Sequence, residues 1–251
     1  MNLLLTLIWR EWEQLIRSVH GLLPLFFAMG ASGALLVWLL RRAEGCFETL
    51  PALWGLSVAF GLPFLAAVAA SRGFTHDREI GMMRLMFATP VRARYWVLGK
   101  VFAAWLLCII YVGGTGLSCW IIIHWILPET AQIPGAWQGF LFALFALSLQ
   151  SLLWSSIGTF VSLFTRSSAA TIFLVLLVCL LAPPAVYLLL TLWFPELRAQ
   201  WPWFPLQEQI YDCAGGIIDG RTMIGYLSAS CVLIYAAGIM FDASRLCATE
   251  R

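Results

Sequence analysis

Six long apolar stretches dominate the sequence, and each is long enough to cross a membrane as a helix. A crossing needs about 20 residues for roughly 30 Å of hydrocarbon. Apolar residues make up 61% of the 251 residues and charged residues 11%, whereas soluble domains have about 45–50% and about 25%. An open sheet cannot satisfy its backbone in lipid, so the crossings must be helical. We predict an all-α polytopic membrane protein, with one transmembrane domain over 1–251 and crossings at 22–40, 50–70, 97–125, 138–164, 169–194 and 223–241.

Residues 1–20 are interrupted by charge and are not expected to cross. Apolar side chains recur there at helical spacing, while Arg10, Glu13 and Arg17 occupy the other face. This pattern predicts an amphipathic helix that lies in the membrane interface. A helix packed on soluble protein is the alternative, and it is less favoured in so apolar a chain.

Two local features shape the fifth crossing. Pro183 and Pro184 remove backbone donors and predict a kink within it. Only residues 165–168 separate it from the fourth crossing, so the two are expected to form a tight hairpin.

Lys and Arg residues are distributed unequally between the two sides of the membrane. Eleven fall on one side, which holds the N-terminal segment, the 71–95 connection with Lys100 just after it, the 165–168 turn and the C-terminal tail, and four fall on the other side. Cytoplasmic loops carry the excess of Lys and Arg, so both termini are predicted to be cytoplasmic. Arg41 and Arg42 are exceptions, because they fall on the predicted outer side. Glu44 and Glu48 lie close to them in the sequence and offset their charge.

The sequence lacks the motifs of a self-contained enzyme. It has no phosphate-binding G-x-x-x-x-G-K-[ST] and no G-x-S-x-G, and its three histidines lack the spacing of metal ligands. An intramembrane protease, which needs a buried Ser/His pair, ranks last among the alternatives. The net charge of +2 does not suggest nucleic-acid binding. We expect no catalytic site, metal site or cofactor in this chain.

Almost no charged residue lies deep within a predicted crossing. A mid-bilayer charge costs about 2.5–3.5 kcal/mol on insertion scales and marks ion or proton pathways. The absence of such charges disfavours a proton-driven carrier and indicates an external energy source. Lys100, near the cytoplasmic end of the third crossing, is expected to snorkel toward water.

The cytoplasmic connection 71–95 mixes charges with bulky apolar side chains. Gly81 permits a bend, and Thr89-Pro90 ends any helix because the residue before proline avoids the α region. We therefore expect a short helix before Thr89 that exposes apolar side chains. A helix of this kind suits a groove on a partner protein, and a position among lipid headgroups is the open alternative. The apolar side chains expected on its surface are Met82, Met83, Leu85, Met86 and Phe87.

Three stretches resemble one family. Phe-x-x-Asp-Arg-Glu-x-Gly from Phe74, followed by Thr89-Pro90-Val91 and Leu98-Gly99-Lys100, is similar to the first cytoplasmic loop of ATP-binding-cassette (ABC) type 2 permeases. The stretch 157–165 with Ala169 and Ala170 resembles the end of that family's fourth span. The stretch 216–221, followed by 226–228, looks like the segment before the last span in the branch with gliding-motility and nitrous-oxide-reductase maturation permeases.

The resemblance implies the membrane subunit of an ABC exporter in the cytoplasmic (inner) membrane. Two such subunits, identical or not, would pair above two separate ATPase subunits, which would bind the ATP and Mg²⁺. Asp77–Pro90 would be the coupling helix that enters a cleft on the ATPase. The residues it assigns to this contact are Arg78, Glu79, Gly81, Met82, Met83, Arg84, Leu85 and Pro90. A membrane scaffold or mechanical subunit for motility or assembly is the alternative. The substrate is not readable from the sequence.

Small residues form a stripe on one face of the fourth crossing: Ser148, Ser151, Ser155, Gly158 and Ser162. Small residues let membrane helices approach closely, so helix packing is favoured over a role in lining a substrate pathway. The pairs Gly30–Ala34, Gly55–Ala59 and Ala66–Ala70 have the same spacing and the same default interpretation.

The outer segment 195–222 is long for a loop. Its aromatic start suits an interfacial anchor, and apolar residues then recur at helical spacing. We predict a short amphipathic or re-entrant helix that either gates substrate exit or caps the bundle. Cys46 and Cys213 are predicted on this same side, which leaves a disulfide between them open.

Overall fold

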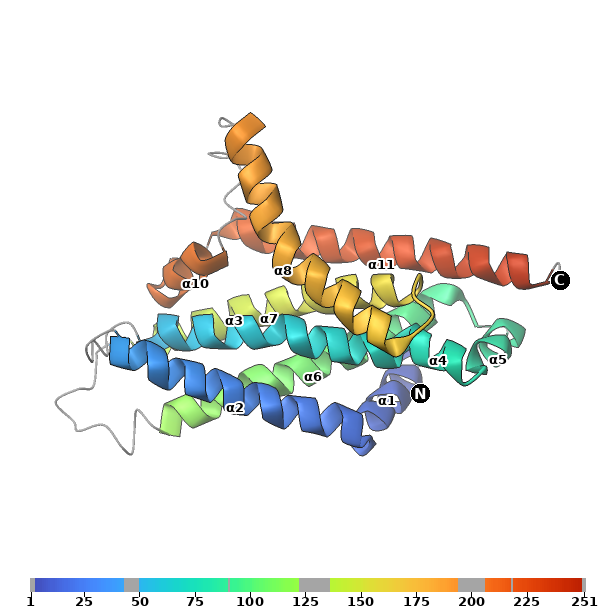
Figure 1. The fold of residues 1–251 in the computed structure, drawn as a ribbon, viewed down its shortest axis with the longest axis horizontal. Helices are drawn as coiled ribbons and strands as arrows, with labels where there is room; N and C mark the ends of the chain where they lie inside the picture. The colour runs from blue at the N-terminus through green and yellow to red at the C-terminus, as the bar shows by residue number, and fades with distance from the viewer. Residues whose placement is uncertain are drawn as a thin grey trace.

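The computed structural model describes residues 3–42, 50–89, 91–121, 136–193, 206–217 and 219–249. Within these ranges all regular secondary structure is helical and there is no strand, so the all-α prediction is confirmed (Figure 1). The helices are α1 (Leu3–Arg17), α2 (Val19–Arg42), α3 (Leu50–Ala70), η2 (Ser71–Thr75), α4 (His76–Glu79), α5 (Met82–Ala88), α6 (Ala93–Ile121), α7 (Ala136–Ser162), α8 (Ser168–Trp193), α10 (Leu206–Ala214) and α11 (Gly220–Thr249).

Five helical segments in the described part of the chain are long and apolar enough to cross a membrane. They are Gly21–Arg42, Leu50–Glu79, Ala93–Ile121, Trp137–Ser162 and Gly220–Leu246. The sixth predicted crossing, 169–194, corresponds to α8, which is helical over Ser168–Trp193 and apolar over Ser168–Leu181. Five crossings are therefore supported, and the sixth stays a prediction.

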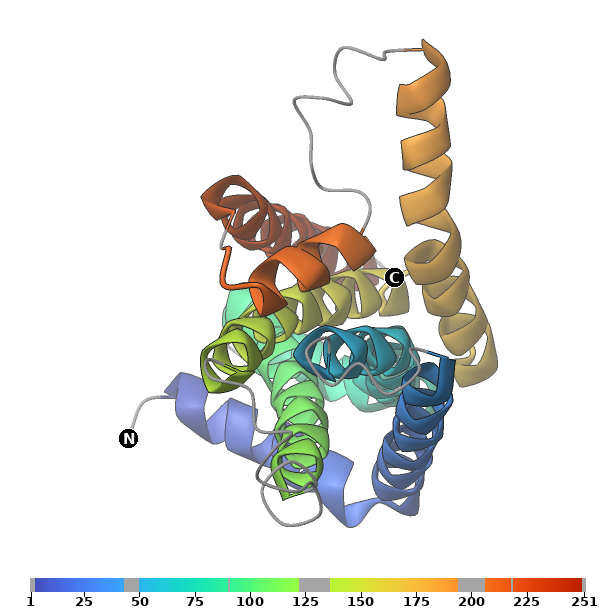
Figure 2. The same cartoon turned by 90° about the vertical axis from the view of Figure 1, so that its left-hand side faces the viewer.

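The helix α8 differs from the others in its course. It is helical from Ser168 to Trp193, yet Figure 1 shows it changing direction partway along its length. The sequence predicts such a change at Pro183-Pro184. Figures 1 and 2 both show that the C-terminal part of α8 diverges from the bundle.

The helix α3 forms the centre of the bundle. It contacts α2, α6, α7 and α8, and most of its residues are buried (Figure 2). Trp54, Val58, Leu62 and Leu65 of α3 are almost fully excluded from the surface. By contrast, large apolar side chains on α2 and α11 are exposed, as expected for helices that face lipid or another chain.

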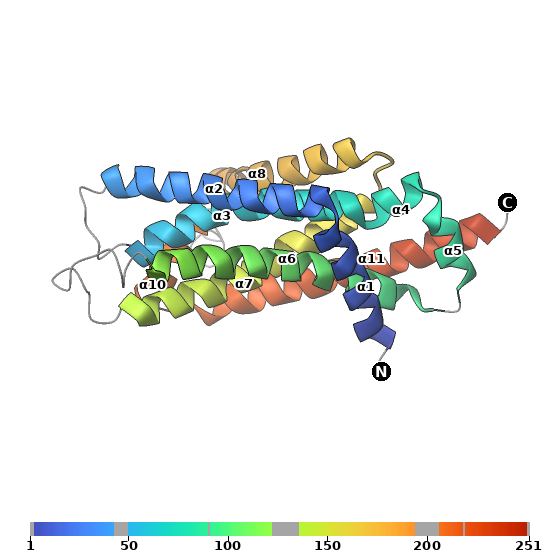
Figure 3. The same cartoon turned by 90° about the horizontal axis from the view of Figure 1, so that it is seen from below.

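The helix α1 crosses one end of the bundle, transverse to the long helices (Figure 3). A sharp turn joins it to α2, and a Cβ on Gly21 would lie 2.0 Å from the carbonyl oxygen of Leu15. One face of α1 packs on α6 and buries Glu11 and Leu15, whereas Trp9 is 67% exposed. Packing on α6 thus accounts for one face of α1, and its position in the membrane interface stays a prediction.

Both chain ends lie toward the same end of the bundle as α4 and α5 (Figures 1 and 3). The topology predicted from the sequence requires this arrangement. Which side of the membrane this end occupies is a separate prediction that rests on the Lys and Arg distribution.

The helices α3 and α7 approach closely where small residues meet. A Cβ on Gly158 would lie 2.8 Å from the Cβ of Ala70 and 3.1 Å from the carbonyl oxygen of Ala66. Such distances leave no room for a methyl group between the two backbones. The packing interpretation therefore fits Gly158 and the Ala66–Ala70 pair. Gly30 has open space beside it, so it makes no comparable contact in the described part of the chain.

Gly158→Ala should therefore destabilise the protein. Overpacking at such a contact costs about 1–3 kcal/mol, and the change should lower the midpoint of thermal unfolding in detergent. Gly238→Ala is the matched control, because a Cβ there meets no atom within 4 Å. Equal unfolding midpoints for the two variants would contradict the close approach of α3 and α7.

Candidate functional site

The segment between α3 and α6 begins with a kink. Residues Ser71–Thr75 form a π-turn in which Gly73 leaves the helical region, with φ −72° and ψ −127°. The next residue, Phe74, is completely buried, and its ring centre lies 5.2 Å from that of Phe241 in α11. The kink therefore turns the chain away from the α3 axis, and Phe74 anchors it.

Asp77 belongs to a buried cluster of three charges. The Nζ of Lys100 in α6 lies 2.6 Å from a carboxylate oxygen of Asp77 and 2.8 Å from one of Glu11 in α1. All three residues are at most 6% exposed. The sequence suggested that Lys100 would snorkel to water. Its side chain is instead buried, because two carboxylates compensate its charge inside the protein. The cluster joins α1, α4 and α6.

Arg78 binds the C-terminal end of α7. Its Nη1 donates to the carbonyl of Thr165 at 2.5 Å and its Nη2 to that of Leu163 at 2.9 Å. The last carbonyls of a helix lack partners within the helix and carry partial negative charge. The guanidinium of Arg78 donates hydrogen bonds to these carbonyls and its positive charge offsets their partial negative charge.

Glu79 binds the start of the neighbouring helix. Its carboxylate accepts the backbone N–H of Ser168 at 2.8 Å and the Ser168 hydroxyl at 2.9 Å. Ser168 is the first residue of α8, where unpaired N–H groups favour a negative charge. Arg78 and Glu79, both in α4, thus hold the two sides of the α7–α8 turn: the end of α7 and the start of α8. We call this arrangement the clamp.

Thr75 adds a third tie to the same hairpin. Its hydroxyl lies 3.1 Å from the carbonyl oxygen of Ser162, 3.0 Å from the hydroxyl of Thr165 and 2.9 Å from that of Thr171. Because Thr75 is fully buried, this network holds the hairpin against α4 without water.

Gly81 separates α4 from α5 and has a φ of +76°, a left-handed conformation that glycine adopts readily. The predicted bend is present. Beyond it, Met83 and Met86 are buried against a cluster that includes Phe241, and Arg245 of α11 donates to the carbonyl of Thr89 at 2.7 Å. These contacts hold α5 against the bundle.

The apolar side chains of α5 were expected on its surface, but Met83 and Met86 are buried. Met82 and Phe87 are half-buried, and Pro90 lies outside the described residues. Three large side chains of this segment are exposed, those of Ile80, Arg84 and Leu85, and we call them the exposed tip. Ile80 and Leu85 are 60% and 63% exposed.

The serine stripe of α7 makes contacts mainly within its own helix. Ser151 donates to the carbonyl of Ser148, and Ser162 to that of Thr159. Ser155 lies beside Cys108 of α6, at 4.0 Å. Of the five predicted residues only Ser148 is not buried. This geometry favours packing, and a role in a pathway stays a prediction.

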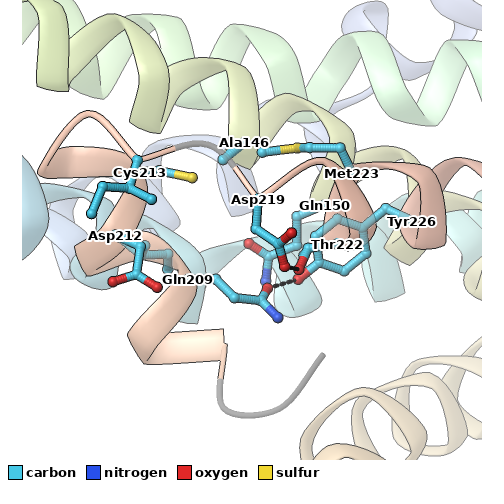
Figure 4. Close-up of a pocket in the computed structure, with 11 residues that line it drawn as sticks. Ala146, Gln150, Gln209, Asp212, Cys213, Asp219, Thr222, Met223 and Tyr226 are labelled. Atoms are coloured by element: carbon cyan, nitrogen blue, oxygen red, sulfur yellow. Dashed lines mark hydrogen bonds between the residues drawn. The ribbon is translucent and has the colours of Figure 1, made fainter. Parts of the chain in front are cut away.

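Part of the outer segment 195–222 is described. α10 packs on α7 and α3, and Ile210 approaches so closely that a Cβ on Gly55 would lie 2.6 Å from it. A cavity of about 70 Å³ lies between α7, α10 and the start of α11 (Figure 4). At its edge the Tyr226 hydroxyl donates to the side-chain oxygen of Gln209. These contacts bind α10 to the bundle, whichever of the two predicted roles it has.

Cys213 lines this cavity as a buried free thiol. Burial raises its pKa, and the negative charges of Asp212 and Asp219 raise it further. The thiol therefore stays protonated and is a weak nucleophile. Cys46 lies outside the described residues, so the disulfide considered from the sequence is not confirmed.

The sequence did not single out the roles of Glu11, Thr75, Ile80 or Lys100. Their partners come from distant parts of the chain: Thr75 contacts residues 162–171, and Glu11 pairs with Lys100. A charged residue inside an apolar stretch, as Lys100 is, was the one available signal for the ion cluster.

The fold and this segment define a polytopic helical membrane protein whose connecting segment is tied to the ends of several of its long helices. The sequence profile of the ABC-2 family transporter proteins matches residues 5–241, and the chain belongs to that family. The predicted family is thereby confirmed. Members are the membrane components of their transporters rather than the ATPases, and they generally work with a cytoplasmic ATPase subunit. No curated protein matched the sequence.

Arg78→Met should loosen the α7–α8 hairpin. It removes two charge-assisted hydrogen bonds from a half-buried site, with a cost of about 1–2 kcal/mol. Amide hydrogen exchange at residues 163–171 should become faster. Arg166→Met is the control, because Arg166 is an exposed arginine of the same hairpin. Unchanged exchange in Arg78→Met would contradict the clamp.

Lys100→Met should strongly destabilise the chain. It leaves the carboxylates of Glu11 and Asp77 buried without their cation, which costs about 3–5 kcal/mol. The triple variant Glu11→Gln, Asp77→Asn, Lys100→Met carries no buried charge at this site and should recover most of the lost thermal stability. If the single and triple variants unfold at the same temperature, unpaired charge is not the cause.

Proposed function

We propose that this chain is the permease subunit of an ATP-driven exporter in the cytoplasmic membrane. Membership of the ABC-2 family supports the permease role. The excess of Lys and Arg at the end that carries α4 and α5 supports a cytoplasmic position for that end and for both termini. In this proposal α8 is the sixth crossing, the whole chain is one permease domain, and two permease subunits pair.

The partner is a cytoplasmic ATPase that binds ATP and Mg²⁺, and the exposed tip is its docking point. Ile80 and Leu85 present apolar surface to solvent at the end of the bundle, with Arg84 between them in sequence. Exposed apolar residues beside a charge are typical of an interaction surface. Met83, although part of the predicted contact, is committed to the bundle instead.

The clamp of Arg78 and Glu79 on the α7–α8 hairpin is the observation that carries the mechanism. A push on α5 reaches α4 within a few residues. Asp77 then transmits it to α6 and α1, Arg78 to α7, and Glu79 to α8. Tightly packed helices that are joined by discrete contacts move as rigid bodies rather than bending. A push of this kind can therefore re-orient whole membrane-spanning helices.

We also propose the branch that includes the gliding-motility and nitrous-oxide-reductase maturation permeases. Its support is the 216–221 stretch, where Asp219 accepts the backbone N–H of Arg221 and the hydroxyl of Thr222 and so caps the start of α11. The substrate class is left open, as is the choice between solute export and mechanical work.

Leu85→Asp, alone or with Ile80→Asp, should release the ATPase. A buried apolar anchor at an interface is worth about 2 kcal/mol or more, so the affinity for the ATPase should fall about thirtyfold or more and less ATPase should co-purify. Leu85→Met, which keeps the apolar contact, is the matched control. The measurement is co-purification with the ABC ATPases of the host, followed by ATP turnover.

If Leu85→Asp and Glu79→Arg both leave co-purification and coupled ATP turnover unchanged, the coupling assignment is wrong. Retained binding with lost turnover in Glu79→Arg alone would instead separate transmission from docking, as the clamp requires.

A further inference from the structure

A cavity of about 340 Å³ lies between α1, the α3–α4 connection and the first turns of α6. Its lining includes His76 and Asp77 of α4 and Met82 of α5, so it lies at the end of the bundle that carries these helices. Its walls come from Arg17 and Ser18 on one side and from Arg72 and His76 on the other. Two of its lining residues, Asp77 and Ile80, also take part in the proposed function, but that function assigns no ligand to the cavity.

Arg72 is a half-buried cation on the cavity wall with no carboxylate within 4 Å among the described residues. Its one described polar contact is between Nη1 and Nε2 of His76, at 3.3 Å. A guanidinium removed from water costs free energy unless an anion pairs with it. Its planar fork fits phosphate oxygens in particular.

The floor of the cavity carries the opposite sign. Glu11, Asp77 and Lys100 all line it, and two carboxylates there share one ammonium. One formal negative charge is left over. Arg17, at the rim, is neutralised by Glu13 at 2.6 Å. The cavity therefore has a positive wall and a negative floor, which suits a ligand that carries both a phosphate and an ammonium group.

Apolar side chains also line the cavity, and they come from several elements: Leu15 of α1, Ala69 of α3, Ile80, Met82 of α5 and Ala103 of α6. Outside the cavity, α1 exposes Leu5 and Trp9, which are 57% and 67% accessible. Tryptophan and leucine on a transverse helix are typical of the membrane surface. A small soluble anion would gain nothing from this apolar surface, whereas the acyl chains of a lipid can lie against it.

We propose that this cavity binds the headgroup of an inner-leaflet phospholipid of the phosphoethanolamine type. Its phosphate pairs with Arg72, and its ammonium lies over the Glu11–Asp77–Lys100 cluster. The inference rests on the membrane orientation of the proposed function. Because the same charge cluster holds Asp77, the bound lipid stabilises the contact between α1 and the coupling segment.

The test counts phospholipids that stay with the purified full-length chain, by native mass spectrometry after exchange into vesicles and re-extraction. Arg72→Ala should lower retention of phosphatidylethanolamine about tenfold, as expected for one lost charge-assisted pair. Arg92→Ala, which changes an exposed arginine outside the cavity, should leave retention unchanged. Glu11→Gln should remove the preference for phosphatidylethanolamine over phosphatidylglycerol.

Three results would overturn the proposal. They are equal retention by Arg72→Ala and wild type, equal retention of phosphatidylglycerol and phosphatidylethanolamine by wild type, and equal thermal stabilisation by inorganic phosphate and by lipid. The last would indicate a site for free phosphate. If Arg72→Ala loses lipid while Leu85→Asp and Glu79→Arg leave co-purification and coupled ATP turnover unchanged, the coupling assignment fails alone. The reverse pattern would remove only the lipid site.

Discussion

One buried ammonium group, that of Lys100, determines how three separate parts of this chain meet. Its two carboxylate partners come from α1 and from α4, and each lies within 2.8 Å. Charges this far from water are tolerated only when they are paired, so α1 and α4 must both be in place for α6 to bury Lys100. The ion cluster around Lys100 adds little to the net free energy of unfolding, but it favours the one arrangement of α1, α4 and α6 in which all three charges are paired. Any movement of α4 relative to α6 has to carry Asp77 with it or break the pair.

The ends of helices supply the second constraint. A helix leaves carbonyls unpaired at its C-terminus and N–H groups unpaired at its N-terminus. In the hairpin between α7 and α8 these groups are satisfied by Arg78 and Glu79 of a neighbouring segment. Two adjacent residues therefore hold the end of one helix and the start of the next. The exposed tip, which lies only a few residues further on, makes no such contacts in the described part of the chain.

Sequence periodicity and hydropathy predicted most of the helices, and α3 was predicted with its observed limits of 50 and 70. The α6 helix begins at Ala93, four residues before the predicted start, because hydropathy cannot register a polar turn that continues a helix. The family resemblance singled out Asp77–Pro90 as the expected coupling helix, and the glycine itself predicted the bend at Gly81. It did not show that Met83 and Met86 face inward, since a short apolar helix can turn either side to the bundle. The partners of Arg78 and Glu79 lie about 85 residues away in the chain, and no local pattern reports them.

The sequence by itself determined that this chain is helical, that it belongs in a membrane and that charge is concentrated between its second and third apolar stretches. These properties follow from composition and from the lack of water in a bilayer, which act on each segment separately. The tertiary structure alone decided which charges are buried, which methionines hold α5 and which large side chains form the exposed tip. Those outcomes depend on which helix ends and side chains meet, and the folded packing sets them because it brings together residues that are far apart in the chain.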